Sequence, residues 1–201
     1  MAVNLQKGVK VNLRKKGVSG IGEILVNLNW NSRPKNEGFF SKLFSSRSGI
    51  DLDLGCLFEL EDGKIGAIQA LGKSFGSLER PPYIALDGDD RTGDSSSGEN
   101  LRINGKKIAE IKRILIYTYI YEGVANWQQA DGTVTIKYPG EEDLIVKMDE
   151  YNSTEKMCAL ALLENVNDET FSVEKLIRFY RGHEAMDRDY HWGLKWVQGR
   201  K

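Results

Sequence analysis

The chain has 201 residues, and because 40% of them are hydrophobic it can form a substantial core and is not an intrinsically disordered protein. Its 28 basic and 29 acidic residues give a formal net charge of −1, so no nucleic-acid partner is expected, since nucleic-acid-binding domains usually carry a basic excess. No apolar run approaches the roughly 20 residues of a membrane-spanning helix, and residues 1–7 lack the apolar core of a signal peptide, which predicts a cytoplasmic protein.

Alternation of apolar and polar residues predicts strands in the first third of the chain. Residues 9–13 alternate, residues 24–30 do so in their second half, and residues 53–60 form a third candidate. Residues 61–64 (Glu-Asp-Gly-Lys) then predict a hairpin turn, because Asp-Gly between two apolar runs favours the tight turns that join antiparallel strands. Residues 65–71 are the expected returning strand.

The second half of the chain also reads mainly as strands. Residues 113–121 are rich in branched and aromatic side chains and almost continuously apolar, which predicts a central strand covered on both faces. Residues 171–180 fit a helical stripe or a strand, and the turn signal just before them favours the strand. Residues 182–190 predict one short helix. Three further runs predict strands: residues 132–138, 143–148 and 157–163.

Short strands separated by turns, with no long amphipathic helix to cover a parallel sheet, predict an all-β fold. We expect an antiparallel two-sheet β-sandwich with long loops and at most short helices. Residues 1–201 would form a single domain, with residues 181–201 as a C-terminal extension packed on it. Two loops interrupt the strand pattern, at residues 31–49 and 72–100.

Residues 87–100 gather five carboxylates and three glycines around a single basic side chain, Arg91. Like charges repel at a cost that rises as they lose water, so a folded loop of this kind needs a counter-charge. Calcium supplies one, because it binds about six to eight oxygens, and glycines let the backbone aim them at one point. The spacing does not follow an EF-hand, since Gly98 stands where the bidentate Glu is needed. The alternative is a solvated acidic loop without metal.

Several segments together resemble the TerD-domain family of tellurium-resistance and stress proteins. Residues 8–17 and 24–30 are similar to the first strands of the family, and residues 51–56 (Asp-Leu-Asp-Leu-Gly-Cys) match its D-x-D motif. Residues 88–93 (Gly-Asp-Asp-Arg-Thr-Gly) match its G-D-N-x-T-G signature. The resemblance covers nearly the whole chain and implies a two-sheet β-sandwich that binds one or two calcium ions at one edge. It also implies a cytoplasmic multi-protein system that responds to tellurite and other stress.

The resemblance also implies the residues that would hold the calcium. They are Asp51, Asp53, Asp87, Asp89, Asp90, Asp94, Glu99 and the backbone near Thr92. Arg91 would lie on the rim and neutralise surplus charge. The family loop usually continues in the form G-E-G-D-G-D-D-E, whereas residues 93–100 here read Gly-Asp-Ser-Ser-Ser-Gly-Glu-Asn. Fewer charged ligands predict weaker binding, or one ion in place of two.

The expected function is therefore that of a calcium-binding module or scaffold that works with other proteins of the resistance system. No catalytic residues are predicted, because the chain has no nucleophile elbow, phosphate-binding loop or dinucleotide-binding glycine pattern. Two alternatives stay open. The metal could be the centre of an enzyme acting on a phosphate or an oxyanion, or the sandwich could be a metal-free interaction scaffold.

Four other groups of residues carry secondary predictions. Phe39, Phe40, Leu43 and Phe44, among basic residues, suit docking on a protein or a membrane surface, or covering an open end of the sandwich. Tryptophans near a C-terminus more often pin it to the core than stack on nucleic-acid bases or bind a partner. A structural role suits the chain's two histidines better than a transition-metal site. The two cysteines lie in apolar runs, which predicts buried thiols.

Overall fold

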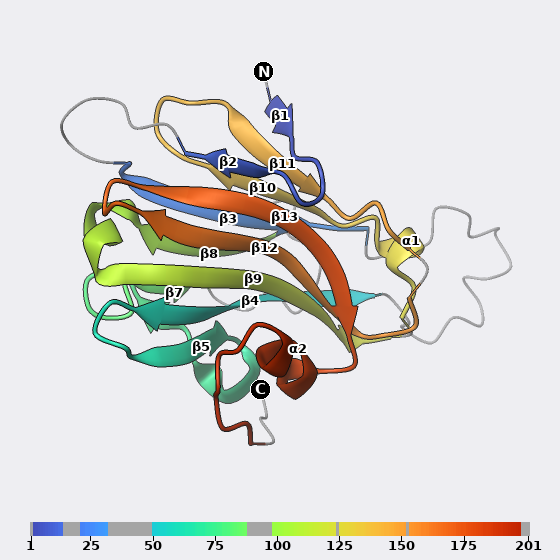
Figure 1. Cartoon of the computed structure of the whole chain (residues 1–201). Coiled ribbons are helices and arrows are strands. Elements are labelled where there is room, and N and C mark those ends of the chain that lie inside the picture. Colours follow the sequence, from blue (N-terminus) through green and yellow to red (C-terminus); the bar gives the residue numbers. More distant parts are fainter. Residues whose placement is uncertain are drawn as a thin grey trace, which may run out of the picture.

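The computed structural model describes residues 2–13, 21–31, 50–87, 98–123, 125–151 and 153–197, which form two stacked sheets (Figure 1). The seven-stranded sheet has the order β1 (Ala2–Asn4), β11 (Asp143–Lys147), β10 (Thr133–Lys137), β3 (Glu23–Asn29), β8 (Glu99–Asn104), β7 (Ile84–Leu86), β6 (Gly76–Ser77). The six-stranded sheet has the order β2 (Lys10–Asn12), β13 (Thr170–Tyr180), β12 (Met157–Val166), β9 (Ile111–Glu122), β4 (Asp51–Leu60), β5 (Ile65–Gln69). The predicted β-sandwich is confirmed.

The strands of both sheets pair almost entirely antiparallel, and the helical segments between them are short. Strand β1 runs parallel to β11, and every other strand pairing among the described residues is antiparallel. The helical segments are brief: η2 (Leu71–Lys73), η3 (Gly105–Glu110), α1 (Trp127–Ala130) and α2 (His183–Asp189). None of the described helices is long and apolar enough to cross a membrane.

Most predicted elements are confirmed, and the exceptions are short strands. The segment that was ambiguous between helix and strand is β13, and the short helix predicted near residue 186 is α2. The expectation that residues 72–100 form one loop is wrong, because β6, β7 and the start of β8 lie there. Strands of two or three residues are too short to show alternation, and backbone pairing with longer neighbours holds them in place.

Strand β9 lies at the centre of the six-stranded sheet, between β12 and β4, and is covered on both faces as predicted. Ile114 and Ile116 point into the core between the sheets, whereas Leu115, Tyr117 and Tyr119 point to the outer face. Removing a large apolar side chain of this kind from water contributes about 1.5–3 kcal/mol. The packing of β9 therefore depends both on the sandwich core and on the residues that cover the outer face of the sheet.

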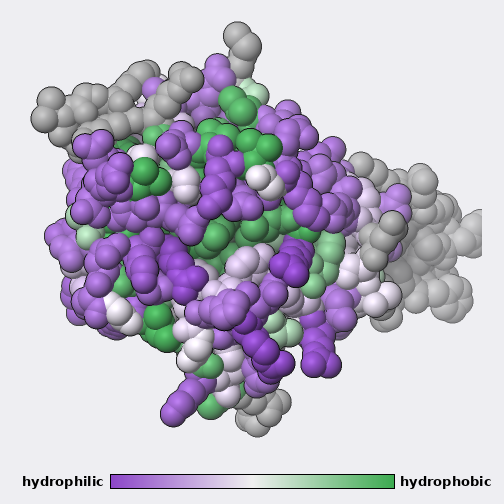
Figure 2. All heavy atoms as spheres, viewed as in Figure 1, coloured by the Kyte–Doolittle hydropathy of each residue, from purple (hydrophilic) through white to green (hydrophobic). Residues whose placement is uncertain are grey.

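The cover of that outer face is α2 and the segment that follows it (Figure 1). The Trp192 indole Nε1 donates to the carbonyl oxygen of Phe58 at 3.0 Å, and the Arg113 guanidinium lies 3.8 Å from its ring centroid. The prediction that a tryptophan pins this end of the chain to the core is confirmed. Beyond α2 the same face keeps half-buried Leu162 and Leu176, and Figure 2 shows a band of hydrophobic residues crossing a mostly hydrophilic surface.

The two cysteines, Cys56 and Cys158, are buried free thiols, as predicted. Burial raises the pKa of both thiols well above the ordinary value, because an apolar environment disfavours the thiolate. Neither is therefore a reactive nucleophile.

Candidate functional site

The acidic segment, residues 87–100, joins β7 to β8, two neighbouring strands of the seven-stranded sheet. Its two ends are fixed: the backbone N–H of Asp87 donates to the carbonyl oxygen of Asn100 at 2.8 Å. Gly98, with φ of +65°, would place any Cβ 2.1 Å from the carbonyl oxygen of Leu28, so only glycine fits there. Residues 88–97 lie outside the described residues, and with them the predicted ligands Asp89, Asp90, Thr92 and Asp94.

Two of the predicted ligands, Asp53 and Glu99, are buried, and Glu99 contacts the residue that follows Asp53. Asp53 has an exposed fraction of 0% and Glu99 one of 4%. They come from different sheets, since Asp53 lies in β4 and Glu99 is the first residue of β8. A carboxylate oxygen of Glu99 accepts a hydrogen bond from the backbone N–H of Leu54, the residue next to Asp53. This contact lies one residue beyond Gly55, where pairing between β4 and β5 stops.

Tyr119 faces the same place from β9. It pairs directly with Asp53 across the two strands, and strand alternation puts both side chains on the outer face. Burial raises the pKa of the Tyr119 phenol above its ordinary value, and the charges of Asp53 and Glu99 raise it further. The phenol therefore stays protonated and does not add a third negative charge.

Burial of these carboxylates costs free energy of folding. Transferring a carboxylate out of water costs several kcal/mol even after the protein relaxes, unless cations or hydrogen-bond donors compensate. Asp51, also a predicted ligand, lies two residues before Asp53 in the same strand and is half-buried, and the pairing of β4 with β9 shifts register between Asp51 and Leu52. Within the described residues, Asp51, Asp53 and Glu99 do not by themselves form a group placed to hold a metal ion.

Asp87 is engaged elsewhere. Its carboxylate accepts from Nε and Nη2 of Arg102 at 2.9 and 3.0 Å, and Nη1 of the same guanidinium donates to Glu23 at 2.7 Å. These partners alternate with core residues of β8 and β3, so the ion pair lies on the outer face of the seven-stranded sheet. The predicted role of Asp87 as a ligand stays a prediction, but its described contacts do not join it to Asp53 and Glu99.

A row of asparagines beside the acidic segment is a feature that the sequence analysis missed. The Asn27 side-chain amide donates to the Asn100 side-chain oxygen at 2.8 Å, and the Asn29 amide donates to the Asn27 side-chain oxygen. The alternation of residues 24–30 could have revealed it, because it leaves Asn27 and Asn29 together on the polar face. The row ties β3 to β8 where the acidic segment ends.

His183 belongs to a buried hydrogen-bond network. In the described ranges no group of three or more His, Cys, Asp and Glu residues is placed to hold a metal ion. His183 Nε2 lies 2.9 Å from the Gln69 side-chain oxygen, which also accepts from the Tyr117 hydroxyl at 2.6 Å. Burial lowers the pKa of His183 to about 4, so the ring is neutral at pH 7 and its role in this network is structural.

Comparison with known proteins agrees with this fold. The sequence model of the TerD domain matches residues 1–170. The chain is 41% identical over 191 residues to the tellurium resistance protein TerA of Alcaligenes sp, which covers 95% of this chain and 56% of that protein. It is 33% identical over 132 residues to the stress response protein SCP2 of Bacillus subtilis (strain 168), covering 64% of this chain and 65% of that protein. The chain thus spans between half and two thirds of these relatives.

Solved structures share the architecture at low sequence identity. A crystallised protein of unknown function, SAV2460, has a TM-score of 0.60 at 13% identity, covering 88% of this chain and 99% of that one. A crystallised homologue of the telluride resistance protein TerD from Streptomyces coelicolor A3(2) has a TM-score of 0.57 at 14% identity, covering 84% and 95%. At these identities the likeness establishes the fold alone.

Proposed function

This chain belongs to the TerD domain family, and on that basis we propose that it is a calcium-binding β-sandwich module of a tellurite- and stress-resistance system. Its relatives TerA and SCP2 are named for tellurium resistance and for stress response, which supports the assignment to such a system. The module would act by binding other proteins of that system in the cytoplasm, and no catalytic step is assigned to it.

The observation that carries the calcium proposal is the burial of Asp53 and Glu99 at the base of the acidic segment. Buried carboxylates from two different sheets are costly, and a divalent cation offsets that cost with a single ion that both can bind. A calcium ion also suits the donor set, since carboxylates, hydroxyls and backbone carbonyls are its usual ligands.

The ion would be bound at one edge of the sandwich, by ligands from both sheets and from the acidic segment. Asp53 and Glu99 would supply one ligand each, from β4 and β8, whereas Asp51 stays a predicted ligand that the described residues do not group with them. The acidic segment would supply the rest: Asp89, Asp90, Asp94 and the backbone near Thr92. Binding would order this segment and give partner proteins a fixed surface to recognise. Because Ser95, Ser96 and Ser97 stand where the family loop is more acidic, we propose weaker binding or a single ion.

Denaturant unfolding with and without calcium tests the proposal. The variants Asp53→Asn and Glu99→Gln each remove one charge and keep a side-chain oxygen of similar size and place. The wild-type protein should gain about 2.7 kcal/mol at a calcium concentration a hundredfold above Kd, and each variant should lose most of that gain. Glu150→Gln is the matched control, because this carboxylate is not a predicted ligand and pairs with Lys7 at 2.6 Å, and it should keep the gain.

The same variants separate a metal site from a buried ion pair with a basic residue such as Arg91. At a metal site, removing one of the buried negative charges leaves the calcium-free protein as stable as the wild type or more stable. In an ion pair, it leaves a buried positive charge alone and costs about 3–5 kcal/mol without calcium. A wild-type protein that calcium does not stabilise, together with that loss, would contradict the proposal.

A further inference from the structure

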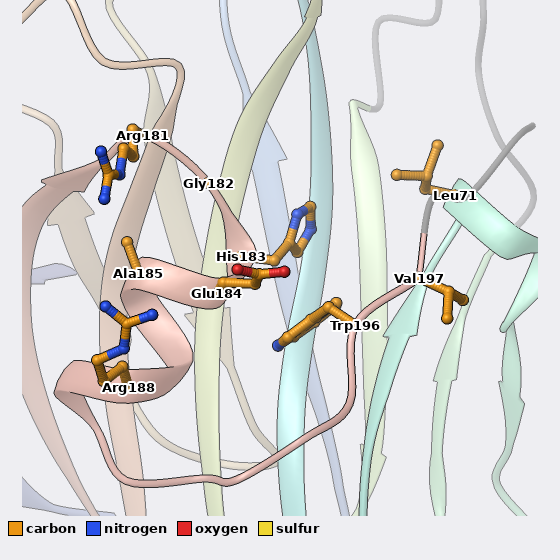
Figure 3. Close-up of a pocket in the computed structure, with 9 residues that line it drawn as sticks. All are labelled: Leu71, Arg181, Gly182, His183, Glu184, Ala185, Arg188, Trp196 and Val197. Atoms are coloured by element: carbon orange, nitrogen blue, oxygen red, sulfur yellow. The ribbon is translucent and has the colours of Figure 1, made fainter.

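The C-terminal segment builds a pocket on the outer face of the six-stranded sheet. Its volume is about 540 Å³, within the range of about 300–1,000 Å³ that is typical of small-molecule sites. Figure 3 shows Arg181, which precedes α2, and Arg188, in α2, on one side, and Leu71 and Val197 across from them, with Trp196 between. The pocket therefore has a charged side and an apolar side.

The apolar side is fixed before any ligand arrives. Asp187 is 5% exposed, and its carboxylate accepts from the backbone N–H groups of Gly193 and Leu194 at 2.8 and 3.0 Å. It also accepts from the Trp196 indole Nε1 at 3.0 Å. The Trp196 ring in turn lies 4.7 Å, centroid to centroid, from the ring of His183. A wall held in this way loses little conformational freedom on binding, which favours affinity.

The charged side carries two guanidiniums that pair with none of the described carboxylates. Within the described part of the chain, neither Arg181 nor Arg188 lies within ion-pair distance of an acidic group, whereas Arg178 pairs with Asp189 at 2.9 Å. Both side chains line the same pocket, Arg181 from the turn between β13 and α2 and Arg188 from α2 itself. Glu184 also lines the pocket, so its wall carries two positive charges against one negative charge.

We propose that this pocket binds a small organic anion with a flat apolar body, such as an aromatic carboxylate or an aromatic phosphate ester. Guanidiniums recognise carboxylate and phosphate groups through paired N–H donors, so Arg181 and Arg188 would hold the acid group. Trp196 and Leu71 would contact the flat body, since aromatic faces favour stacked or edge-on ring contacts. His183 is neutral and fixed on Gln69, so it shapes the wall without competing for the anion.

Calorimetric titration of the full chain tests the proposal with four probes. Benzoate and phenyl phosphate carry both the acid group and the ring, benzamide is the neutral counterpart of benzoate, and inorganic phosphate lacks the ring. We expect at least one aromatic anion to bind at 1:1, about tenfold or more tighter than benzamide and than inorganic phosphate. Which of the two binds tighter identifies the acid group.

Three variants locate the site. Arg181→Gln and Arg188→Gln should each weaken binding about three- to tenfold, because each removes one charged donor at an exposed position. Glu184→Gln should tighten it by a similar factor, because it removes the competing negative charge, and a merely structural role of this segment would not produce that gain. Arg178→Gln is the matched control, since Arg178 does not line the pocket.

The proposal is overturned if neither aromatic anion binds, or if benzamide or inorganic phosphate binds as tightly as they do. It is also overturned if the Arg181 and Arg188 variants, shown by circular dichroism to be folded, keep wild-type affinity.

Discussion

Two regions of this sandwich bury carboxylates, and they do so in different ways. Asp187 accepts three N–H hydrogen bonds from Gly193, Leu194 and Trp196, all within ten residues of it along the chain. Asp53 and Glu99 come from different sheets and meet through the backbone of Leu54, which is 45 residues from Glu99 in sequence. In the first region, the donors that stabilise the buried carboxylate come from the same short stretch of chain. The second region lies at the two ends of the acidic segment.

The difference separates a structural carboxylate from a candidate ligand. A carboxylate surrounded by fixed N–H donors is stabilised as an anion and acts as a local staple for the chain. Asp53 and Glu99 come from separate sheets, and Glu99 ends a sequence segment that holds four further carboxylates, a concentration of negative charge that favours a cation. The predictions below test whether the two regions are energetically independent.

The largest effect should follow from Asp187→Ala. The change leaves three N–H donors without an acceptor at a buried position, and we expect a loss of about 3 kcal/mol in the free energy of unfolding. Urea unfolding monitored by circular dichroism measures it. The calcium-dependent gain should persist in this variant. Loss of that gain would show that the two regions are coupled and would break the comparison.

The next effect concerns the acidic segment itself. The double variant Asp89→Asn, Asp90→Asn should abolish the calcium-dependent stabilisation of about 2.7 kcal/mol at a hundredfold excess over Kd, because two charged ligands become neutral. The same unfolding experiment measures it, with magnesium in place of calcium as the control. An unchanged calcium response would remove this segment from the site.

Gly55→Ala tests how closely β4 packs against Tyr117 of β9, between the two regions. A Cβ at Gly55 would lie 2.7 Å from the ring of Tyr117, its cross-strand neighbour, so the ring must move and we expect a loss of about 2 kcal/mol. Thermal unfolding measures the change. Gly182→Ala is the matched control, because φ of 169° is ordinary extended backbone and no atom lies within 4 Å of its Cβ position. Equal losses in both variants would argue against this packing account.

The smallest effect should be a change in pH dependence. The pKa of His183 is lowered to about 4 by burial, whereas an unfolded histidine titrates near pH 6.5. Between these values the unfolded chain binds the extra proton, so the contribution of His183 to stability is lost as pH falls from about 6.5 to about 4. Relative to His183→Gln, the wild type should lose on the order of 1 kcal/mol between pH 7 and pH 5. Parallel stability curves for the two proteins would contradict this.

The long strands were predictable from sequence because their patterns depend on the chain alone. Strands β4, β9 and β13 each have at least ten residues and carry enough apolar or branched side chains to identify them. Strands β6 and β7 have two and three residues, and β1 exists because β11 offers it an edge. Such strands depend on partners distant in sequence, which no local pattern reveals.

The candidate site was predictable in part for the same reason. The motifs identified Asp53 and Glu99, but the burial of both depends on the register that sets Asp53 opposite Tyr119 and on the contact of Glu99 with a strand of the other sheet. The ion pair of Asp87 with Arg102 depends on the pairing of β7 with β8. The sequence shows how many charged side chains there are, but the register between strands decides which of them lie on the same face of a sheet.

Calorimetric titration of calcium into chelator-stripped protein, with magnesium as the control, tests the central claim most directly. The account predicts saturable binding of one or two ions, preferred over magnesium, in the wild type and in Asp187→Ala, and its loss in Asp53→Asn and Glu99→Gln. No binding heat from the wild type at millimolar calcium, or unchanged binding in the Asp53 and Glu99 variants, would contradict the assignment of these buried carboxylates to a calcium site.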